Sequence, residues 1–426
     1  MYIRKKIDKS ELRKKSERLN IPIIKLLLQR LKDCSEKEKI NYTLLAVCPN
    51  SKNVLKASLR SAKRMNTPMI FAATLNQVDS DGGYTGWTHK DLIRVIKEES
   101  YNIGYDGPII TCIDHGGPWL KDIQVIEKWD YKRSMLWIKK SFEEALLAGF
   151  DLIHIDPTID IYQNVINIET VADRTLELIL FIEEFRKSKR IKAIAYEVGT
   201  EEVHGGLANI GIFKEFLKIL KIGLSKYNLD YAWPYFIVGK VGTDLHTTTF
   251  DPIVAKKLVD ISKIYGSYIK GHYTDFVSNP KEYPIIGIGA ANIGPELTMV
   301  EYDALMELCK IEEELYEKNN IACKSNFKFV LEQSVLNSGR WKKWLREGET
   351  DFNQLDSERK ELIIKTSARY IWELPEVTCS EKYLFRNLEL NGIDAENWVL
   401  TNIEANIEKY FMAFNLVNLN KKLGQS

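Results

Sequence analysis

Short apolar runs alternate with amphipathic stretches through most of the chain, from about residue 43 to residue 318. Stretches with helical periodicity follow the runs, as expected for buried parallel strands joined by helices. Eight such units predict an α/β fold, a closed (β/α)₈ TIM barrel. The apolar runs are residues 44–48, 69–73, 108–113, 152–156, 192–198, 233–238, 268–271 and a less distinct run within 285–293.

An open doubly wound sheet is the alternative fold, and it usually has one dominant phosphate loop where the strand order reverses. Here polar clusters follow nearly every apolar run, which favours a barrel, because all of its strands end at one catalytic face. The seventh unit fits least well, since only residues 274–283 separate the last two runs. That length is too short for a full crossover helix.

Helix starts support this division of the chain. Ser51 can cap a helix that runs to about Met65, and Thr88 can cap the helix that begins with His89. Asp251 precedes Pro252, and proline suits the first turn of a helix. On the helix capped by Thr88, we expect His89 to be a surface residue.

The two ends of the chain lack the strand alternation. Residues 1–40 are predicted to form a charged N-terminal helical segment with one apolar stripe. Residues 41–318 are expected to form the barrel with the active site. Residues 319–426 read as a helical C-terminal extension rich in Trp, Tyr, Lys and Glu, and we expect it to serve stability or assembly rather than chemistry.

Composition excludes several classes of function. The formal net charge of +1 gives no global field for nucleic acid or an anionic membrane. No stretch approaches the ~20 apolar residues of a membrane span, and no signal peptide is evident. Six cysteines are scattered without a C-x-x-C pair, which suits reduced thiols. We therefore expect a cytoplasmic protein.

Candidate chemistry lies at the ends of the predicted strands. His115 ends the third strand region beside Asp114, His246 follows the sixth strand, and His272 follows the seventh. Three protein ligands with one open position is the layout of a catalytic zinc. The alternative is three separate, hydrogen-bonded barrel histidines. Glu201, after the fifth strand, is a further candidate ligand or base.

Two polar residues on the fourth strand leave a similar choice open. His154 and Asp156 are two positions apart, so they point the same way on their strand. They either complete the site or form a satisfied buried pair.

Glycine-rich stretches offer backbone N–H groups to a phosphate. They are residues 82–86, the pair Gly205-Gly206, and residues 287–294. The last stretch leads into the helix at Pro295, whose amino end favours an anion. Barrels often bind phosphate at this place, after strands seven and eight.

The loop Ala73-Thr74-Leu75-Asn76-Gln77-Val78-Asp79, with Gly82-Gly83-Tyr84-Thr85-Gly86, resembles a known family. It is similar to the hallmark loop of the Z-type subunit of D-tagatose-1,6-bisphosphate aldolase, the GatZ/KbaZ family. The resemblance covers nearly the whole chain from about Tyr42. Further motifs in the family's order are Asp114-His115, Ile153-His154-Ile155-Asp156, Gly199-Thr200-Glu201, Trp233-Pro234, His246-Thr247, His272-Tyr273-Thr274-Asp275, Gly294-Pro295, Val330-Leu331-Glu332 and Tyr370-Ile371-Trp372.

This family is similar to the class II aldolases, which are zinc-dependent (β/α)₈ barrels. The resemblance implies that His115, His246 and His272 bind a divalent metal, Zn²⁺, that Asp114 is the acid/base, and that Glu201 lies near the metal. Members are described as a non-catalytic partner that a catalytic class II aldolase subunit requires, and some related proteins interconvert ketohexoses or their phosphates at C4. We expect a homo-oligomer and assign substrate and phosphate binding to Asn76, Gln77, Gly83, Tyr84, Gly205, Gly206, Asn292 and Gly294.

The chain departs from the family pattern at four places in the expected pocket. Cys112-Ile113 replaces Gly-Gly, and Gly116-Gly117-Pro118-Trp119 replaces Leu-Gly-Pro-Asn. Lys270 replaces an acidic residue, and Asn292 replaces a lysine. These changes affect the expected substrate more than the fold or the metal.

Two functions follow as hypotheses. The first is a metal-dependent aldolase or C4 epimerase acting on a ketohexose or ketohexose phosphate. The second is a non-catalytic, stabilising subunit of a class II aldolase. The intact set of Asp114 and three histidines favours activity. A sugar kinase is disfavoured, because the chain has no G-x-x-x-x-G-K-[ST] loop.

Overall fold

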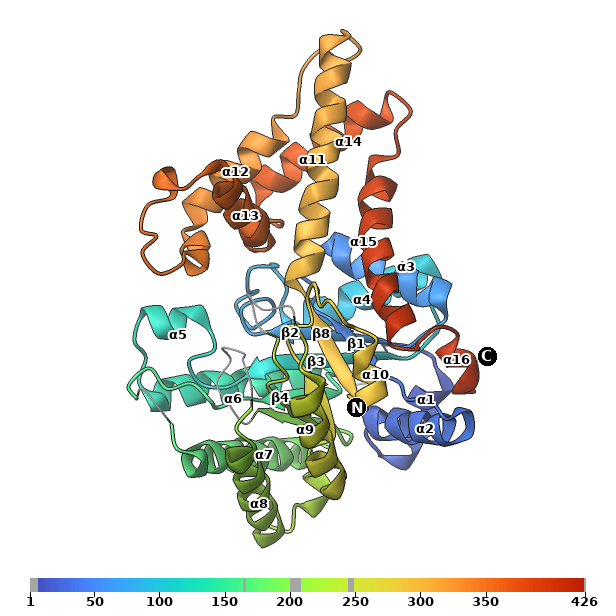
Figure 1. Ribbon diagram of the computed structural model, residues 1–426, viewed down its shortest axis with the longest axis vertical. Helices are drawn as coiled ribbons and strands as arrows, with labels where there is room; N and C mark the ends of the chain where they lie inside the picture. Colours follow the sequence, from blue (N-terminus) through green and yellow to red (C-terminus); the bar gives the residue numbers. More distant parts are fainter. Residues whose placement is uncertain (1–6, 164–165, 200–207, 244–248, 425–426) are drawn as a thin grey trace.

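The protein is described here by a computed structural model, which covers residues 7–163, 166–199, 208–243 and 249–424. Eight parallel strands form a closed barrel in sequence order, and β1 pairs with β8 to complete it (Figure 1). This confirms the predicted (β/α)₈ fold. The strands are β1 (Leu44–Val47), β2 (Met69–Thr74), β3 (Ile109–Gly116), β4 (Leu152–Ile155), β5 (Ala195–Gly199), β6 (Phe236–Val238), β7 (Tyr268–Gly271) and β8 (Ala290–Ile293).

Helices of the barrel begin at the predicted caps. The Ser51 side chain accepts from the Val54 N–H, and Thr88 forms a capping box with Asp91. The seventh unit has only a five-residue helix, as its length required. The helices are α3 (Lys52–Met65), α4 (His89–Ile103), α5 (Asp122–Ile126), α6 (Tyr131–Ala148), α7 (Ile168–Ser188), α8 (Ile210–Lys226), α9 (Pro252–Ile264), α10 (Glu282–Ile286) and α11 (Pro295–Glu317).

His89 is not on the surface, and that prediction was wrong. Its side chain packs edge-on against the ring of Phe150, at 5.4 Å between centroids, and lies 3.4 Å from the Ser141 hydroxyl. Burial lowers its pKa to about 4, so it is neutral at pH 7. The first residue of a helix can face inward when the neighbouring helix lies against its turn.

Of the amino-terminal helices α1 (Glu11–Leu19) and α2 (Ile23–Glu38), α1 is anchored at the start of β3. Arg13 is buried and pairs with Asp8 and with Asp151, and its guanidinium also donates to the carbonyl of Ile109. Because Ile109 begins β3, this buried network lies at the amino end of the strand, away from the catalytic face.

The carboxyl-terminal helices surround the outer part of α11, which extends well beyond the barrel (Figure 1). The last long helix returns toward the barrel beside α3, where Glu404 pairs with Arg60 and Arg64. These helices are α12 (Phe327–Ser338), α13 (Ser357–Ser367), α14 (Pro375–Glu389), α15 (Ala395–Ala413) and α16 (Leu419–Lys422), with 3₁₀ turns at Arg340–Trp344, Phe352–Gln354 and Ala368–Tyr370.

The extension also reaches across to the loop that follows β3. Arg340 and Lys343, in the 3₁₀ turn after α12, both pair with Asp122 at the start of α5. The extension is therefore attached to the barrel on two sides. Among the described residues, no helix is long and apolar enough to span a membrane.

Candidate active site

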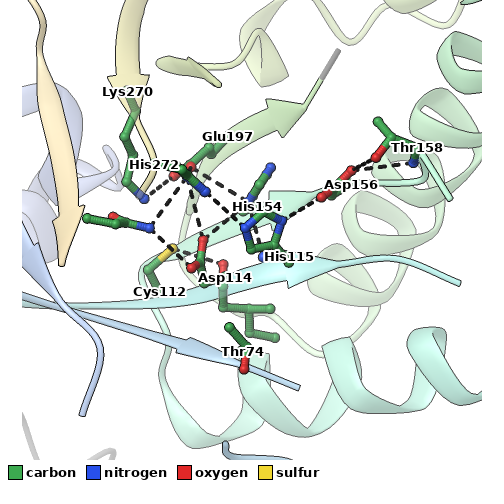
Figure 2. Close-up of polar contacts among 12 residues, drawn as sticks. Thr74, Cys112, Asp114, His115, His154, Asp156, Thr158, Glu197, Lys270 and His272 are labelled. Carbon is green, nitrogen blue, oxygen red and sulfur yellow. Dashed lines mark hydrogen bonds and ion pairs between the residues drawn. The ribbon is translucent and has the colours of Figure 1, made fainter. Parts of the chain in front are cut away.

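The carboxyl ends of five barrel strands bring charged and imidazole side chains into one cluster (Figure 2). Parallel strands all end at the same face, so residues far apart in sequence converge there. The cluster contains three of the predicted site residues that bear on acid/base chemistry and metal binding. Its members are Asp114, His115, His154, Glu197, Lys270, His272 and Asn292.

A break in the regular geometry of β3 allows Asp114 and His115 to face the same site. Successive residues of a regular strand point to opposite faces. The register between β3 and β4 shifts between Ile113 and Gly116, and His115 adopts a left-handed backbone conformation with φ of 51°. Bulges of this kind redirect side chains next to active sites. The two adjacent residues thereby both contribute to one cluster.

His115 is oriented by a buried carboxylate. Its Nδ1 lies 2.6 Å from Oδ2 of Asp156, and the other carboxylate oxygen, Oδ1, accepts from the Thr158 hydroxyl at 2.5 Å. Burial opposes the charged imidazolium, but the charge of Asp114 and the contact with Asp156 outweigh it and raise the pKa of His115 to about 9. Asp156 is thus a support for His115, and the His154–Asp156 pair does not form directly.

His272 is oriented in the same manner from the other side. Its Nε2 lies 3.1 Å from Oε1 of Glu197, and the second carboxylate oxygen of Glu197 accepts from Lys270 at 2.7 Å. Burial lowers the pKa of His272 to about 4. The pKa of Glu197 falls to about 2, because the charges of Lys270 and His154 outweigh its own burial.

The two oriented imidazoles face one another through their remaining nitrogens. His115 Nε2 lies 2.9 Å from His272 Nδ1, and the rings meet at 90°. With a pKa of about 9, His115 is protonated at pH 7, and its Nε2–H donates to Nδ1 of the neutral His272. Metal binding would release this proton, and both inner nitrogens would then present lone pairs to the same point. A histidine that ligates a metal usually donates its other ring N–H to a carboxylate in this manner.

Asp114 lies beside this point. Its Oδ2 accepts from the Asn292 amide at 3.1 Å, and its Oδ1 lies 3.3 Å from His154 Nδ1 and 3.7 Å from His272 Nε2. Burial favours the neutral acid, but the neighbouring His115 and His272 hold the pKa of Asp114 well below its usual range. Asp114 is therefore a carboxylate at pH 7 and can accept a proton.

His154 belongs to the cluster but is held differently. The backbone N–H of His115 donates to His154 Nδ1 at 3.1 Å, which places the ring proton on Nε2. Nε2 is buried, with no hydrogen-bond partner among the described residues. A Cβ at Gly199 would lie 3.3 Å from this atom. Glycine at the end of β5 thus leaves room beside an unpaired N–H.

The donor set fits a divalent metal. Ligand atoms of Asp114, His115, His154 and His272 all lie within 4.8 Å of one another. Among the described residues, the three buried carboxylates of the cluster and its support, Asp114, Asp156 and Glu197, are opposed by one buried ammonium, Lys270. Once His115 has released its extra proton, two negative charges are left, which one divalent cation would balance. Mixed imidazole and carboxylate ligands suit transition metals.

Four predicted residues, Glu201, Gly205, Gly206 and His246, lie outside the described residues, and their roles stay predictions. Thr243, one residue before the undescribed segment that contains His246, donates from its hydroxyl to the carbonyl oxygen of His272 at 2.9 Å. Thr243, at the end of the described segment, is therefore in contact with one of the other expected ligands.

The loop after β2 is held by its own predicted binding residues. The Asn76 amide donates to the Leu120 carbonyl, and its oxygen accepts from the Asp122 N–H. The Gln77 side chain accepts from the Thr74 N–H and also donates to Asn50. These side chains fix the loop, and substrate contact for them stays a prediction.

Gly83 and Tyr84 complete the same loop. A Cβ at Gly83 would lie 2.3 Å from the Gln77 carbonyl oxygen, so only glycine fits this turn. The Tyr84 hydroxyl donates to Asn50 Oδ1 at 3.0 Å, and the Asn50 amide donates to the Gly294 carbonyl at 2.8 Å. The loop is thus tied to the end of β8.

The amino end of α11, expected to receive a phosphate, already holds an anion of the chain itself. Asp275 Oδ1 accepts from the N–H groups of Gly294 and Glu296, each at 2.8 Å. Burial raises the pKa of Asp275 to about 6. A phosphate bound by Gly294 would have to displace this carboxylate, and that role of Gly294 stays a prediction.

Glu197 is the main site residue that the sequence did not single out. It is fully buried between Tyr196 and Val198 in β5. A charged residue inside an apolar strand run was the available signal, because buried charges need partners. Its partners Lys270 and His272 lie 73 and 75 residues away, so the contact itself was not visible.

Comparisons with solved structures agree with the fold. A solved structure described as a probable tagatose 6 phosphate kinase from Sinorhizobium meliloti has a TM-score of 0.72 and 21% identity, and the match covers 87% of this chain and 100% of that one. A fructose-bisphosphate aldolase from Campylobacter jejuni has a TM-score of 0.53 and 13% identity, with 92% and 94% covered. At these identities the likeness shows the fold alone.

The family comparison covers most of the chain. The family described as D-tagatose-1,6-bisphosphate aldolase subunit GatZ/KbaZ-like matches residues 28–412, from α2 to the end of α15. This confirms the resemblance seen in the loop after β2 and at the strand ends. The chain is a member of the GatZ/KbaZ-like family of D-tagatose-1,6-bisphosphate aldolase subunits.

Proposed function

We propose that this protein performs metal-dependent aldol and retro-aldol chemistry on a ketohexose phosphate, as an aldolase or a C4 epimerase. The observation that carries the proposal is the pair of inward-facing nitrogens, His115 Nε2 and His272 Nδ1, 2.9 Å apart beside Asp114. His115, His272 and His246 would hold the ion, which we propose to be Zn²⁺. When bound, a divalent metal acts as a Lewis acid that polarises a substrate carbonyl.

The residues of the chain supply the proton transfers and the orientation. Asp114, ionised and held by Asn292, takes the proton of the C4 hydroxyl as the C3–C4 bond breaks. The bonding electrons move toward the C2 carbonyl group, which leaves an enediolate and an aldehyde. Return of the proton and re-addition to the opposite face of the aldehyde gives the C4 epimer, whereas release of both fragments is aldol cleavage.

The supporting carboxylates fix this arrangement before substrate arrives. Asp156 and Glu197 hold the two imidazoles from behind, and Lys270 holds Glu197. Orientation of this kind keeps reacting groups near their productive geometry.

The alternative is that the chain acts as the stabilising, non-catalytic subunit of a class II aldolase. The family description as an aldolase subunit favours it. The two functions predict different behaviour for the isolated chain. Only the enzyme has its own turnover, whereas the accessory subunit raises the activity or stability of a catalytic partner.

The deciding experiment combines metal analysis with product analysis. Purified protein is loaded with zinc, its metal content is measured, and fructose and tagatose phosphates are followed by NMR. An epimer without triose identifies an epimerase, and triose phosphate identifies an aldolase. The His272→Ala variant should lose both metal and turnover. No turnover of any sugar, together with activation of a catalytic aldolase subunit on mixing, would support the alternative.

A further inference from the structure

The C-terminal extension places an arginine beside the carboxyl ends of the barrel strands. Arg369 lies in the 3₁₀ turn Ala368–Tyr370, and the ring of Tyr370 contacts the ring of Tyr84 edge-on at 5.3 Å. Tyr84 belongs to the loop after β2. The Tyr84 hydroxyl donates to Asn50 Oδ1 at 3.0 Å, and the Asn50 amide donates at 2.8 Å to the carbonyl of Gly294, which directly follows β8. Arg369 therefore lies near the strand ends that carry the site.

Aromatic rings hold this guanidinium in place. One of its Nη atoms donates to the Tyr370 hydroxyl at 3.0 Å, and its central carbon lies 4.7 Å from the Trp344 ring and 5.0 Å from the Tyr370 ring. Its Nε is buried and has no hydrogen-bond partner among the described residues. No ion pair joins it to a carboxylate in the part of the chain that the structure describes. The guanidinium group is thus held in place, but not all of its N–H groups donate a hydrogen bond.

Other cations near these strand ends are already paired. Lys270 pairs with Glu197 at 2.7 Å, and Lys121 pairs with Asp79 at 2.9 Å. Arg340, which stacks on the same Tyr370 ring, pairs with Asp122 at 2.6 Å. Arg369 differs from all three, because among the described residues no carboxylate lies within ion-pair distance of it, and Asp275 interacts with it only through its charge.

The amino end of α11, which could otherwise bind an anion, is also occupied by a side chain of the protein. Asp275 accepts from both Gly294 and Glu296 at the start of α11, so the N–H groups of that turn are in use. An anionic end group of a substrate at the barrel mouth therefore meets Arg369 as an available cation. A guanidinium can bind either phosphate or carboxylate through two parallel hydrogen bonds.

We propose that Arg369 binds the anionic end group of the sugar, a phosphate or a carboxylate, and so sets the preference for charged over neutral sugars. This rests on the proposed function for the identity of the ligand as a sugar. The binding itself does not require turnover. The extension then contributes a specificity-determining residue to the barrel, in addition to its role in stability.

The test measures binding by calorimetry to the full-length chain. The probes are inorganic phosphate, D-fructose 6-phosphate, D-fructuronate and D-fructose. The variants are Arg369→Gln and Arg369→Lys, with Arg346→Gln as the matched control, because Arg346 is exposed on the same extension and its change removes the same charge. Melting temperatures are recorded for each protein.

We expect Arg369→Gln to weaken binding of the preferred anionic sugar by about 10- to 100-fold, since a charge-assisted contact is lost. The affinity for D-fructose should stay within about twofold of the wild-type value. Arg369→Lys should fall in between, and Arg346→Gln should match the wild type. A stronger effect on D-fructose 6-phosphate than on D-fructuronate identifies phosphate as the group, and the reverse identifies carboxylate.

Equal losses for charged and neutral sugars, or no loss at all, would overturn the proposal. Failure of the wild-type chain to bind any of the anionic probes would also overturn it. If Arg369→Gln does not fold, the test uses Arg369→Lys, which keeps the charge and the aliphatic stem. The ratio of its affinity for the charged sugar to its affinity for D-fructose is then compared with the wild-type ratio. A protein that discriminates by charge but shows no turnover would retain this proposal and reject the proposed enzyme.

Discussion

The hydroxyl of Tyr410 lies 3.0 Å from the carbonyl oxygen of Thr274, two residues beyond His272, although 136 residues separate the two partners. The same hydroxyl lies 2.5 Å from Oε2 of Glu296, in the first turn of α11. The last long helix thus holds the loop that carries one of the expected ligands. Residues without contact to the substrate can in this way affect the geometry of the site.

We expect Tyr410→Phe to lower the free energy of unfolding by about 1.5–3 kcal/mol, as for other hydrogen bonds to charged groups. Metal should also bind more weakly, because the loop after β7 loses an anchor. Thermal unfolding and metal titration measure the two effects. Tyr383→Phe, at a position that is 40% exposed on α14, is the control. Unchanged unfolding and metal affinity in Tyr410→Phe would contradict this role.

Asp156→Asn is expected to weaken metal binding by about 10- to 100-fold, the usual effect of losing a supporting carboxylate. The change removes the charge that orients His115 but keeps the size of the side chain. Competition with a chromogenic chelator gives the affinity. Asp173→Asn, exposed on α7, should behave as wild type. If Asp156→Asn binds metal as tightly as that control does, His115 is not oriented by this carboxylate.

Asp114→Asn should lower kcat by roughly 10²–10⁴-fold, since it removes the acid/base group but preserves the shape of the side chain. The zinc content should stay close to that of the wild type, because the imidazoles remain in place. Steady-state rates and metal analysis on the same preparation separate the two effects. Full activity in this variant would exclude Asp114 as the base.

The Glu301→Gln variant is expected to lose a pH dependence of stability. Burial raises the pKa of Glu301 to about 8, with the Ser51 hydroxyl and the Glu381 and Glu373 carboxylates close to it. Between the ordinary value of 4.5 and about 8, the unfolded chain is deprotonated at this residue while the folded chain keeps the proton. The folded state then binds more protons, so the free energy of unfolding falls as pH rises through this window.

Melting temperatures at pH 5 and pH 8.5 test this. The wild type should lose stability of the order of a few kcal/mol from this residue over the interval, and Glu301→Gln should lose less. Glu314→Gln, exposed on the same helix, should follow the wild type. The idea fails if the Glu301→Gln and wild-type curves run parallel.

The barrel was predictable because strands buried on both faces read as continuous apolar runs, and caps such as Ser51 and Thr88 mark where the helices begin. His115 and His272 could be placed at strand ends for the same reason. These features depend on neighbours in sequence, and local patterns therefore record them.

The contacts that complete the site depend on neighbours in space. No local pattern shows that Glu197 meets His272 across the barrel, or that Asp275 occupies the amino end of α11. The irregular backbone at His115, which turns two consecutive residues to one site, was equally hidden. Such features arise only when the barrel closes.

The pairing of α15 with α3 has a consequence for synthesis. Arg64 and Glu408 are 344 residues apart, yet they pair in the finished protein. At ~5–20 residues per second, a ribosome needs roughly 17–70 s to add that length of chain. During this time α3 has emerged without its final neighbour, and its outer face is uncovered. The nascent chain therefore needs α15, its last long helix, to cover α3. A stalled ribosome would leave the outer face of α3 exposed to chaperones and to aggregation.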